Sequence, residues 1–122
     1  MKKLFFPIFF LAFAPLSASA QNSKQYLDCS HNAQPQAAMN ACADQELRRV
    51  DTELNGTYRA LMAKTAQQAE TAAKIKSAQK AWLVFRDAYL EAMYPMQVAL
   101  LRAKLSRQQT AAIKDLLRQH TN

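Results

Sequence analysis

Cys29 and Cys42 are the two cysteines of this 122-residue sequence. Their thiols could form a disulfide or take part in redox chemistry. A catalytic dithiol normally has two residues between its cysteines, a spacing that this pair lacks. In an oxidising compartment, a disulfide between them would close a loop of about 13 residues, worth roughly 3 kcal/mol of stability. We therefore expect a structural disulfide, with free or redox-active thiols as the alternative.

Metal binding and catalysis find little support among the other polar residues. The two histidines, His31 and His120, are too few and too scattered for a metal site. Four carboxylates of one expected helix allow a glycosidase-like pair to be imagined: Asp44, Glu46, Asp51 and Glu53. Carboxylates beside arginines on a helix, here Arg48 and Arg49, are more often surface ion pairs. The single glycine excludes a glycine-rich phosphate-binding loop. We expect no catalytic residue, no metal and no cofactor.

Basic side chains are concentrated in the second half of the chain. The formal net charge is +7, and it becomes +5 without residues 1–20, which contain two lysines and no acidic residue. Residues 21–66 hold five basic and five acidic side chains, whereas residues 67–122 hold nine and four. Eight basic residues are candidates for contacts with an anionic partner: Lys74, Lys76, Lys80, Arg102, Lys104, Arg107, Lys114 and Arg118. The alternative is a solvated helical surface that keeps the protein soluble.

Residues 1–20 have the pattern of a secretory signal peptide. Lys2 and Lys3 precede an apolar run from Leu4 to Leu16, and Ala18-Ser19-Ala20 is a cleavage site of small residues. The run is shorter than the ~20 residues that span a bilayer, which disfavours an uncleaved anchor. We expect cleavage after Ala20 and a single domain over residues 21–122 in the periplasm or outside the cell. The anionic partner would then be a lipid headgroup, lipopolysaccharide, a cell-wall polymer or an acidic protein. Nucleic acid is not expected, because no stacking aromatics interleave with the charges.

The elements that must position these residues are helices. Apolar residues recur every three or four positions after Pro35, which suits the first turn of a helix. They are Met39, Ala43, Leu47, Val50, Leu54, Tyr58, Leu61 and Thr65. Gly56 lies inside this helix, where it would allow either the close approach of another helix or a bend. The polar stretch 64–71 is expected to contain the end of the helix and a turn.

A second helix is predicted by another apolar stripe, which ends before Pro95. The stripe consists of Ile75, Ala78, Trp82, Phe85, Tyr89 and Ala92 or Met93. Trp82 and Phe85 are expected at the centre of the core, because they have the largest apolar areas of the exported part. Arg86 shares a face with Gln79 and is expected to pair with an acidic group such as Asp51, with a further hydrogen bond to Asn55 or Gln79. A ligand-binding role for these polar residues is the alternative.

The last segment allows two interpretations. One is a short helix from about Met96 to Leu105, followed by a helix over 107–119 that Ser106 and Gln109 begin as a capping box. The other is a single helix over 96–119. The final helix would bury three apolar side chains: Ile113, Leu116 and Leu117. No strand-like alternation is visible, so the predicted fold is all-α, a small bundle or folded hairpin of three to four helices.

Two segments resemble the lysozyme inhibitor LprI-like family: CADQELRRVDTELNGTYRALM (Cys42–Met62) and AQKAWLVFRDA (Ala78–Ala88). The matching motif residues include Asp51, Leu54, Asn55, Tyr58, Gln79, Trp82, Arg86 and Asp87. Many members have a second cysteine pair, at about the positions of Leu90 and Leu101, and a Gly-Gly-Ser-like loop that is absent here. The loss of both of these cysteines supports pairing of Cys29 with Cys42.

The resemblance implies binding without catalysis. The family is named for lysozyme inhibition, in which an inhibitor occludes the cleft of the enzyme, so the expected partner is a lysozyme or another envelope or secreted protein. Animal-type lysozymes are basic, and a protein of charge +5 would be repelled unless its neutral N-terminal half made the contact. The motif residues are expected to be structural, so the resemblance assigns no inhibitory residue. The alternatives are an accessory or immunity-type interaction module and a binder of anionic envelope surfaces.

Overall fold

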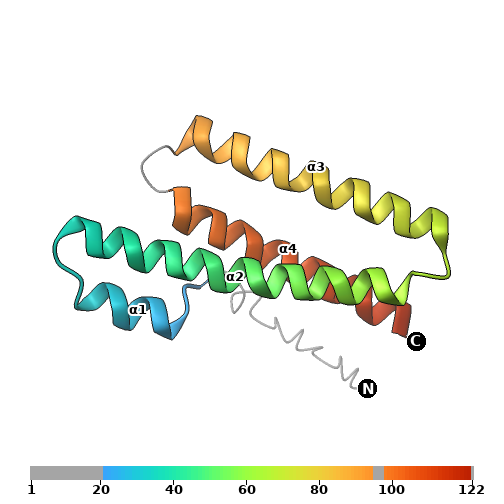
Figure 1. Cartoon of the computed structure of the whole chain (residues 1–122), viewed down its shortest axis with the longest axis horizontal. Helices are drawn as coiled ribbons and strands as arrows, with labels where there is room; N and C mark the ends of the chain where they lie inside the picture. The colour runs from blue at the N-terminus through green and yellow to red at the C-terminus, as the bar shows by residue number, and fades with distance from the viewer. Residues whose placement is uncertain (1–20, 95–97, 122) are drawn as a thin grey trace, which may run out of the picture.

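The computed structural model describes residues 21–94 and 98–121 as four helices (Figure 1). These are α1 (Lys24–His31), α2 (Gln36–Lys64), α3 (Ala69–Met93) and α4 (Val98–Thr121). The all-α prediction with a Cys29–Cys42 disulfide is confirmed. The expectations for the signal peptide and for Pro95 fall on residues outside the described ranges. No helix in the described part of the chain is long and apolar enough to cross a membrane.

Consecutive helices run in opposite directions, so α2 and α4 are parallel to each other (Figure 1). The main interface of the protein lies between α2 and α4. The short helix α1 packs against the N-terminal half of α2, and α3 lies along one side of the α2–α4 pair. This arrangement leaves one side of α3 without a neighbouring helix among the described elements.

The apolar core lies between α2 and α4 and is centred on Leu54, Leu61 and Ile113. Trp82 packs against this core but is only partly buried. The expectation that Phe85 lies at the core centre is wrong, because 58% of its surface is exposed. The buried residues of α3 are Gln79, Arg86 and Leu90. The buried side of α3 therefore includes two polar residues, and a search for apolar residues alone does not identify it.

Helix α2 follows the predicted stripe from Val50 onward but not before it. Met39 is exposed, and the buried residues of the first half are Cys42, Glu46 and Val50. This face differs because α1 packs on it and is joined to it by the disulfide. Of the two possibilities left open at Gly56, the close approach of a helix is not observed, since nothing lies within 4 Å of where a Cβ would be.

Helix α4 is one continuous element over Val98–Thr121, which decides between the two interpretations of the last segment. The predicted capping box at Ser106 is therefore wrong. Ser106 lies inside the helix and is completely buried. Of the apolar residues expected to be buried there, Ile113 lies in the core and Leu117 packs against it, whereas Leu116 is exposed.

Candidate functional site

Arg86 joins three helices through a network that we call the Arg86 junction: Asp51, Arg86, Asp87 and Ser106. Nη1 of Arg86 donates to Asp51 Oδ1 at 3.0 Å and to Ser106 Oγ at 2.8 Å. Its Nε donates to Asp87 Oδ1 at 2.8 Å, and Ser106 donates to Asp51 Oδ1 at 2.7 Å. The guanidinium lies 5.5 Å from the centre of the Trp82 ring, a cation–π distance. The network ties α2, α3 and α4 together at one level.

The expected pair between Arg86 and Asp51 is confirmed, but the expected hydrogen bond of Arg86 to Asn55 or Gln79 is not formed. Gln79 instead accepts a hydrogen bond from Gln109 of α4 at 3.0 Å, and Asn55 is exposed. The apolar motif residues of α2 are part of the core: Leu54 lies in it and Tyr58 packs against it. The motif residues are therefore brought together mainly at the contacts between helices.

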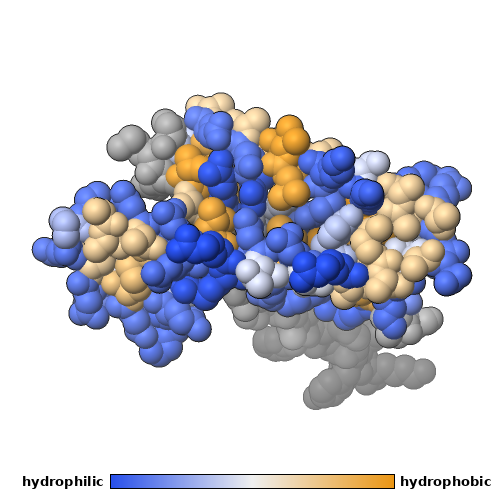
Figure 2. Space-filling view, viewed as in Figure 1, coloured by the Kyte–Doolittle hydropathy of each residue, from blue (hydrophilic) through white to orange (hydrophobic). Residues whose placement is uncertain are grey.

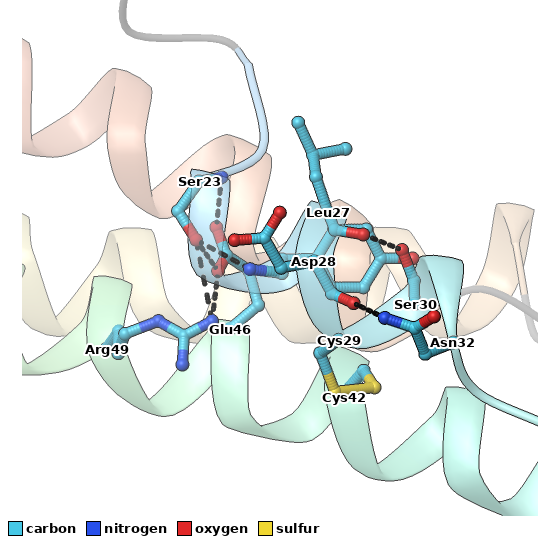
Figure 3. Close-up of a disulfide and its surroundings, with 10 residues drawn as sticks. Ser23, Leu27, Asp28, Cys29, Ser30, Asn32, Cys42, Glu46 and Arg49 are labelled. Carbon is cyan, nitrogen blue, oxygen red and sulfur yellow. Dashed lines mark hydrogen bonds and ion pairs between the residues drawn. A yellow bond between two sulfur atoms is a disulfide. The ribbon is translucent and has the colours of Figure 1, made fainter.

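Glu46 is the centre of a second buried network, at the start of α1 (Figure 3). Its side chain is fully buried and accepts hydrogen bonds from Ser23 N at 2.9 Å, Ser23 Oγ at 2.5 Å and Arg49 Nη2 at 2.7 Å. Arg107 of α4 forms an ion pair with the same carboxylate. Burial by itself raises the pKa of Glu46, but these hydrogen bonds and the charge of Arg107 lower it from 4.5 to about 2.

The disulfide lies one helical turn from Glu46 (Figure 3). It joins Cys29 of α1 to Cys42 of α2, with 5.8 Å between their Cα atoms. Cys42 is buried, so the bond pins α1 to the inner face of α2. The disulfide and the Glu46 network thus fix both ends of α1.

Ser106 and Glu46 are two buried network residues whose positions the sequence reasoning did not predict. The buried residues of α4 follow a spacing of three or four: Ala103, Ser106, Thr110 and Ile113. Ser106 shares this spacing, but its burial was not predicted because Ser106 and Gln109 match the capping-box pattern of a helix start. Glu46 lies four residues from both Cys42 and Val50, which are buried, so the same periodicity could have identified it. Its charge favoured a surface position instead.

The eight basic candidates fall into two groups. Five form ion pairs within the chain: Lys74 with Glu70, Arg102 with Asp87 and Glu91, Arg107 with Glu46, Lys114 with Glu53, and Arg118 with Asp115. The other three are exposed and form no ion pair with a described residue: Lys76, Lys80 and Lys104. Arg102 and Arg107 are mostly covered, at 24% and 12% exposure of their side chains, so they offer little surface to a partner.

Asp87 is held between two of these arginines. It accepts from Arg86 Nε at 2.8 Å and from Arg102 Nε at 3.0 Å. Burial raises its pKa, but the hydrogen bonds and charges of Arg86 and Arg102 outweigh that effect and lower the pKa below its usual value of 3.8. Arg102 also binds Glu91 at 3.0 Å, so this group extends the Arg86 junction to the surface.

Two surfaces with exposed apolar side chains stand out among the described residues. The first is a hollow where α1 meets α2, lined by Tyr26, Leu27, His31 and Met39 among others, and both Leu27 and Met39 are exposed. The second is a stripe on α3 that faces away from α4, and Figure 2 shows apolar side chains breaking the hydrophilic surface along that upper edge. Among the described residues, no three histidine, cysteine or carboxylate side chains lie together as a metal site would require.

Comparisons with known proteins relate this sequence to one family. The family model described as lysozyme inhibitor LprI matches residues 28–113. An uncharacterised protein of Rhizobium meliloti (strain 1021), R02472, is 33% identical over an alignment that covers 87% of this chain and 90% of that protein. No solved structure matches the chain. The matched range contains the Arg86 junction, Glu46 and both cysteines, which supports the resemblance carried by the two sequence segments.

Proposed function

Because the chain belongs to the lysozyme inhibitor LprI family, we propose that it is an exported protein that binds a protein partner, with a lysozyme as the first candidate. The match over residues 28–113 carries this proposal. The charged motif residues also support binding without catalysis. Arg86, Asp87 and Asp51 are engaged with one another and with Ser106, so they stabilise the packing of helices. Leu90 and Leu101, at the positions of the second cysteine pair of many members, line one hollow between α3 and α4.

The surface that we assign to the partner is the hollow between α1 and α2. It lies in the neutral half of the chain, where a basic lysozyme meets least repulsion. Leu27 and Met39 offer exposed apolar area, and Tyr26 and His31 provide a polar rim. The disulfide and the Glu46 network hold this surface rigid, which lowers the entropy lost on binding.

A lysis assay tests the proposal. The purified protein, in excess over enzyme, is added to bacterial cell walls with a c-, g- or i-type lysozyme, and the loss of turbidity is followed. We expect lysis by at least one of the three enzymes to slow. The double substitution Leu27→Glu and Met39→Glu should weaken inhibition at least about tenfold, because it places charge in the apolar contact. Leu116→Glu, an exposed leucine on α4, is the matched control. Unimpeded lysis by all three enzymes would exclude lysozyme as the partner.

A pull-down from periplasmic extract separates lysozyme inhibition from an accessory or immunity-type role. Capture of another secreted or envelope protein, lost in the Leu27→Glu, Met39→Glu variant, would assign the same surface to a different partner. This outcome would preserve protein binding and reject the inhibitor activity.

Binding to an anionic envelope surface is a second candidate, favoured by the three exposed lysines without an ion pair to a described residue, Lys76, Lys80 and Lys104. Vesicles with anionic lipid should bind the protein at low salt and release it at high salt, because such contacts are screened within about 10 Å at 0.1 M salt. Replacement of all three lysines by glutamine should abolish binding. Association that persists at high salt would contradict an electrostatic origin.

A further inference from the structure

Helix α3 carries an apolar surface that no described element covers. We call it the α3 outer face: Ala81, Val84, Phe85, Ala88, Tyr89, Ala92 and Met93. All seven residues are exposed, and Val84 and Phe85 expose 71% and 58% of their surface. Phe85 and Tyr89 stack on each other with ring centres 5.5 Å apart. Apolar residues at spacings of three and four form the side of a helix that normally packs against another element.

The shape of the outer face suits a second helix. Its residues extend over three turns of α3, or about 18 Å at 1.5 Å per residue. Small alanines at 81, 88 and 92 alternate with larger side chains, which provides the ridges and grooves for close packing of two helices. A contiguous apolar strip of this kind on a soluble protein marks an interaction site more often than a random surface feature.

The charges beside the outer face indicate which helix fits. Lys80 and Glu91 are eleven residues apart, which is close to three helical turns, so they flank the same side of the stripe at opposite ends. In a pair of antiparallel copies, Lys80 of each copy lies beside Glu91 of the other. A parallel pair about a twofold axis would place Lys80 of one copy and Glu91 of the other on opposite sides of the contact, so neither edge pair could form.

Both flanking charges are available for such a contact. Lys80 is exposed and forms no ion pair with a described residue. Glu91 is 67% exposed and contacts Arg102 through Oε1. Its Oε2 forms no hydrogen bond with another described residue, so it can accept one from a lysine of a second molecule.

We propose that the α3 outer face is a dimerisation surface, on which two copies of this chain pack their α3 helices antiparallel about a twofold axis near Phe85. The twofold axis makes the contact self-complementary: each apolar stripe covers the other, and two Lys80–Glu91 pairs form at its edges. The hollow between α1 and α2 remains open in this arrangement, because it is lined by other helices.

Sedimentation equilibrium of the protein purified after expression of the full chain tests this dimer. We expect a monomer–dimer equilibrium with a dissociation constant in the micromolar range, as suits a small interface. Val84→Glu should abolish the dimer over the concentrations tested, because it places a charge from each copy inside the apolar contact. Circular dichroism should show that the variant remains folded, since Val84 is exposed in the monomer.

Charge reversal tests the antiparallel register. Lys80→Glu alone and Glu91→Lys alone should each raise the dissociation constant about tenfold, because both edge pairs become repulsive. The double variant K80E/E91K should restore it to about the original value. Lys76→Glu, which makes the same charge change on α3 away from the stripe, is the control and should leave the dimer intact.

A monomer at all concentrations overturns the proposal, as does a dimer that Val84→Glu leaves unchanged. Failure of the double variant to restore association overturns the antiparallel pairing on which the proposal depends. A monomeric protein whose inhibition of lysozyme is lost in Val84→Glu would also overturn it, and would assign the outer face to the enzyme.

Discussion

Arg86 combines burial, charge and hydrogen bonding in one side chain. Only 6% of the residue is exposed, yet its guanidinium donates to two carboxylates and one hydroxyl. A buried charge is tolerated when its partners satisfy it, and loss of one partner leaves the others uncompensated. The Arg86 junction is therefore a place where a single substitution affects three helices.

Replacement of Arg86 by methionine should destabilise the protein by about 3 kcal/mol, because the stem is kept while Asp51, Asp87 and Ser106 lose their shared donor. Urea unfolding followed by circular dichroism measures the difference. Arg118→Met removes an exposed arginine that is paired with Asp115, and it should change the free energy of unfolding by less than about 0.5 kcal/mol. Equal effects of the two substitutions would show that the Arg86 junction adds nothing beyond a surface pair.

The lowered pKa of Glu46 predicts that the protein loses stability in acid. This pKa is about 2 in the folded protein and near 4.5 when unfolded, so the charged form of Glu46 is favoured by folding. The resulting stability is fully present above about pH 4.5 and is lost as the pH falls through about 2. A shift of this size corresponds to about 3 kcal/mol. The lowered pKa of Asp87 adds a loss in the same direction as the pH falls below its usual value of 3.8.

Glu46→Gln isolates this contribution. The variant should be less stable than the original protein at neutral pH, and its free energy of unfolding should fall less between pH 4.5 and 2. Glu70 forms a surface ion pair with Lys74 and provides the control, since Glu70→Gln should change the free energy of unfolding at neutral pH by less than about 0.5 kcal/mol. Parallel pH profiles for the original protein and Glu46→Gln would contradict the role assigned to Glu46.

At the scale of elements, periodicity predicted where helices lie better than which side of each is buried. The second half of α2 was predicted correctly because Val50, Leu54 and Leu61 are both apolar and buried. Helix α3 has apolar residues on two sides, and its buried side includes Gln79 and Arg86. A search for apolar periodicity therefore assigned Phe85 to the core. Only contacts from α2 and α4 distinguish the two sides, and these come from the tertiary structure.

The expected helix start at Ser106 shows the same limit. Serine followed three residues later by glutamine is a pattern for a helix start, but Ser106 serves here as an internal hydrogen-bonding residue. Helix α1 was not predicted, since eight residues from Lys24 to His31 provide too short a pattern. Its position depends on Cys42 and Glu46, which belong to α2 and lie outside α1 in the sequence.

Removal of the disulfide should release α1 selectively. The double variant C29S/C42S should lose about 3 kcal/mol of stability, because the unfolded chain is no longer constrained by the loop. Hydrogen exchange should accelerate more at the amides of α1 than at those of α4. The amides of α4 next to Ile113 serve as the internal reference, since they belong to the core. Uniform acceleration across all helices would indicate that α1 is not a separately anchored element.

On the whole molecule, the two proposed binding surfaces lie in halves of the chain that differ in charge. The neutral half forms the hollow between α1 and α2, and the outer face of α3 lies in the basic half. Many basic side chains of that half are already paired within the chain, so the net charge of +5 in residues 21–122 overstates the charge presented to a partner. The partner proposals therefore depend on local surfaces and not on the net charge.

The export that we propose agrees with the disulfide that fixes α1, because disulfides form and persist in oxidising compartments. Expression of the full chain in a Gram-negative host should yield periplasmic protein that begins at Gln21, with a mass two hydrogen atoms below that of reduced residues 21–122. Ala20→Arg should block processing, since the cleavage site needs small residues, and precursor should accumulate at the membrane. Leu27→Arg makes a similar change beyond the site and should leave processing intact. Periplasmic protein that retains residues 1–20, or a mature form with free thiols, would contradict the link between export and the anchoring of α1.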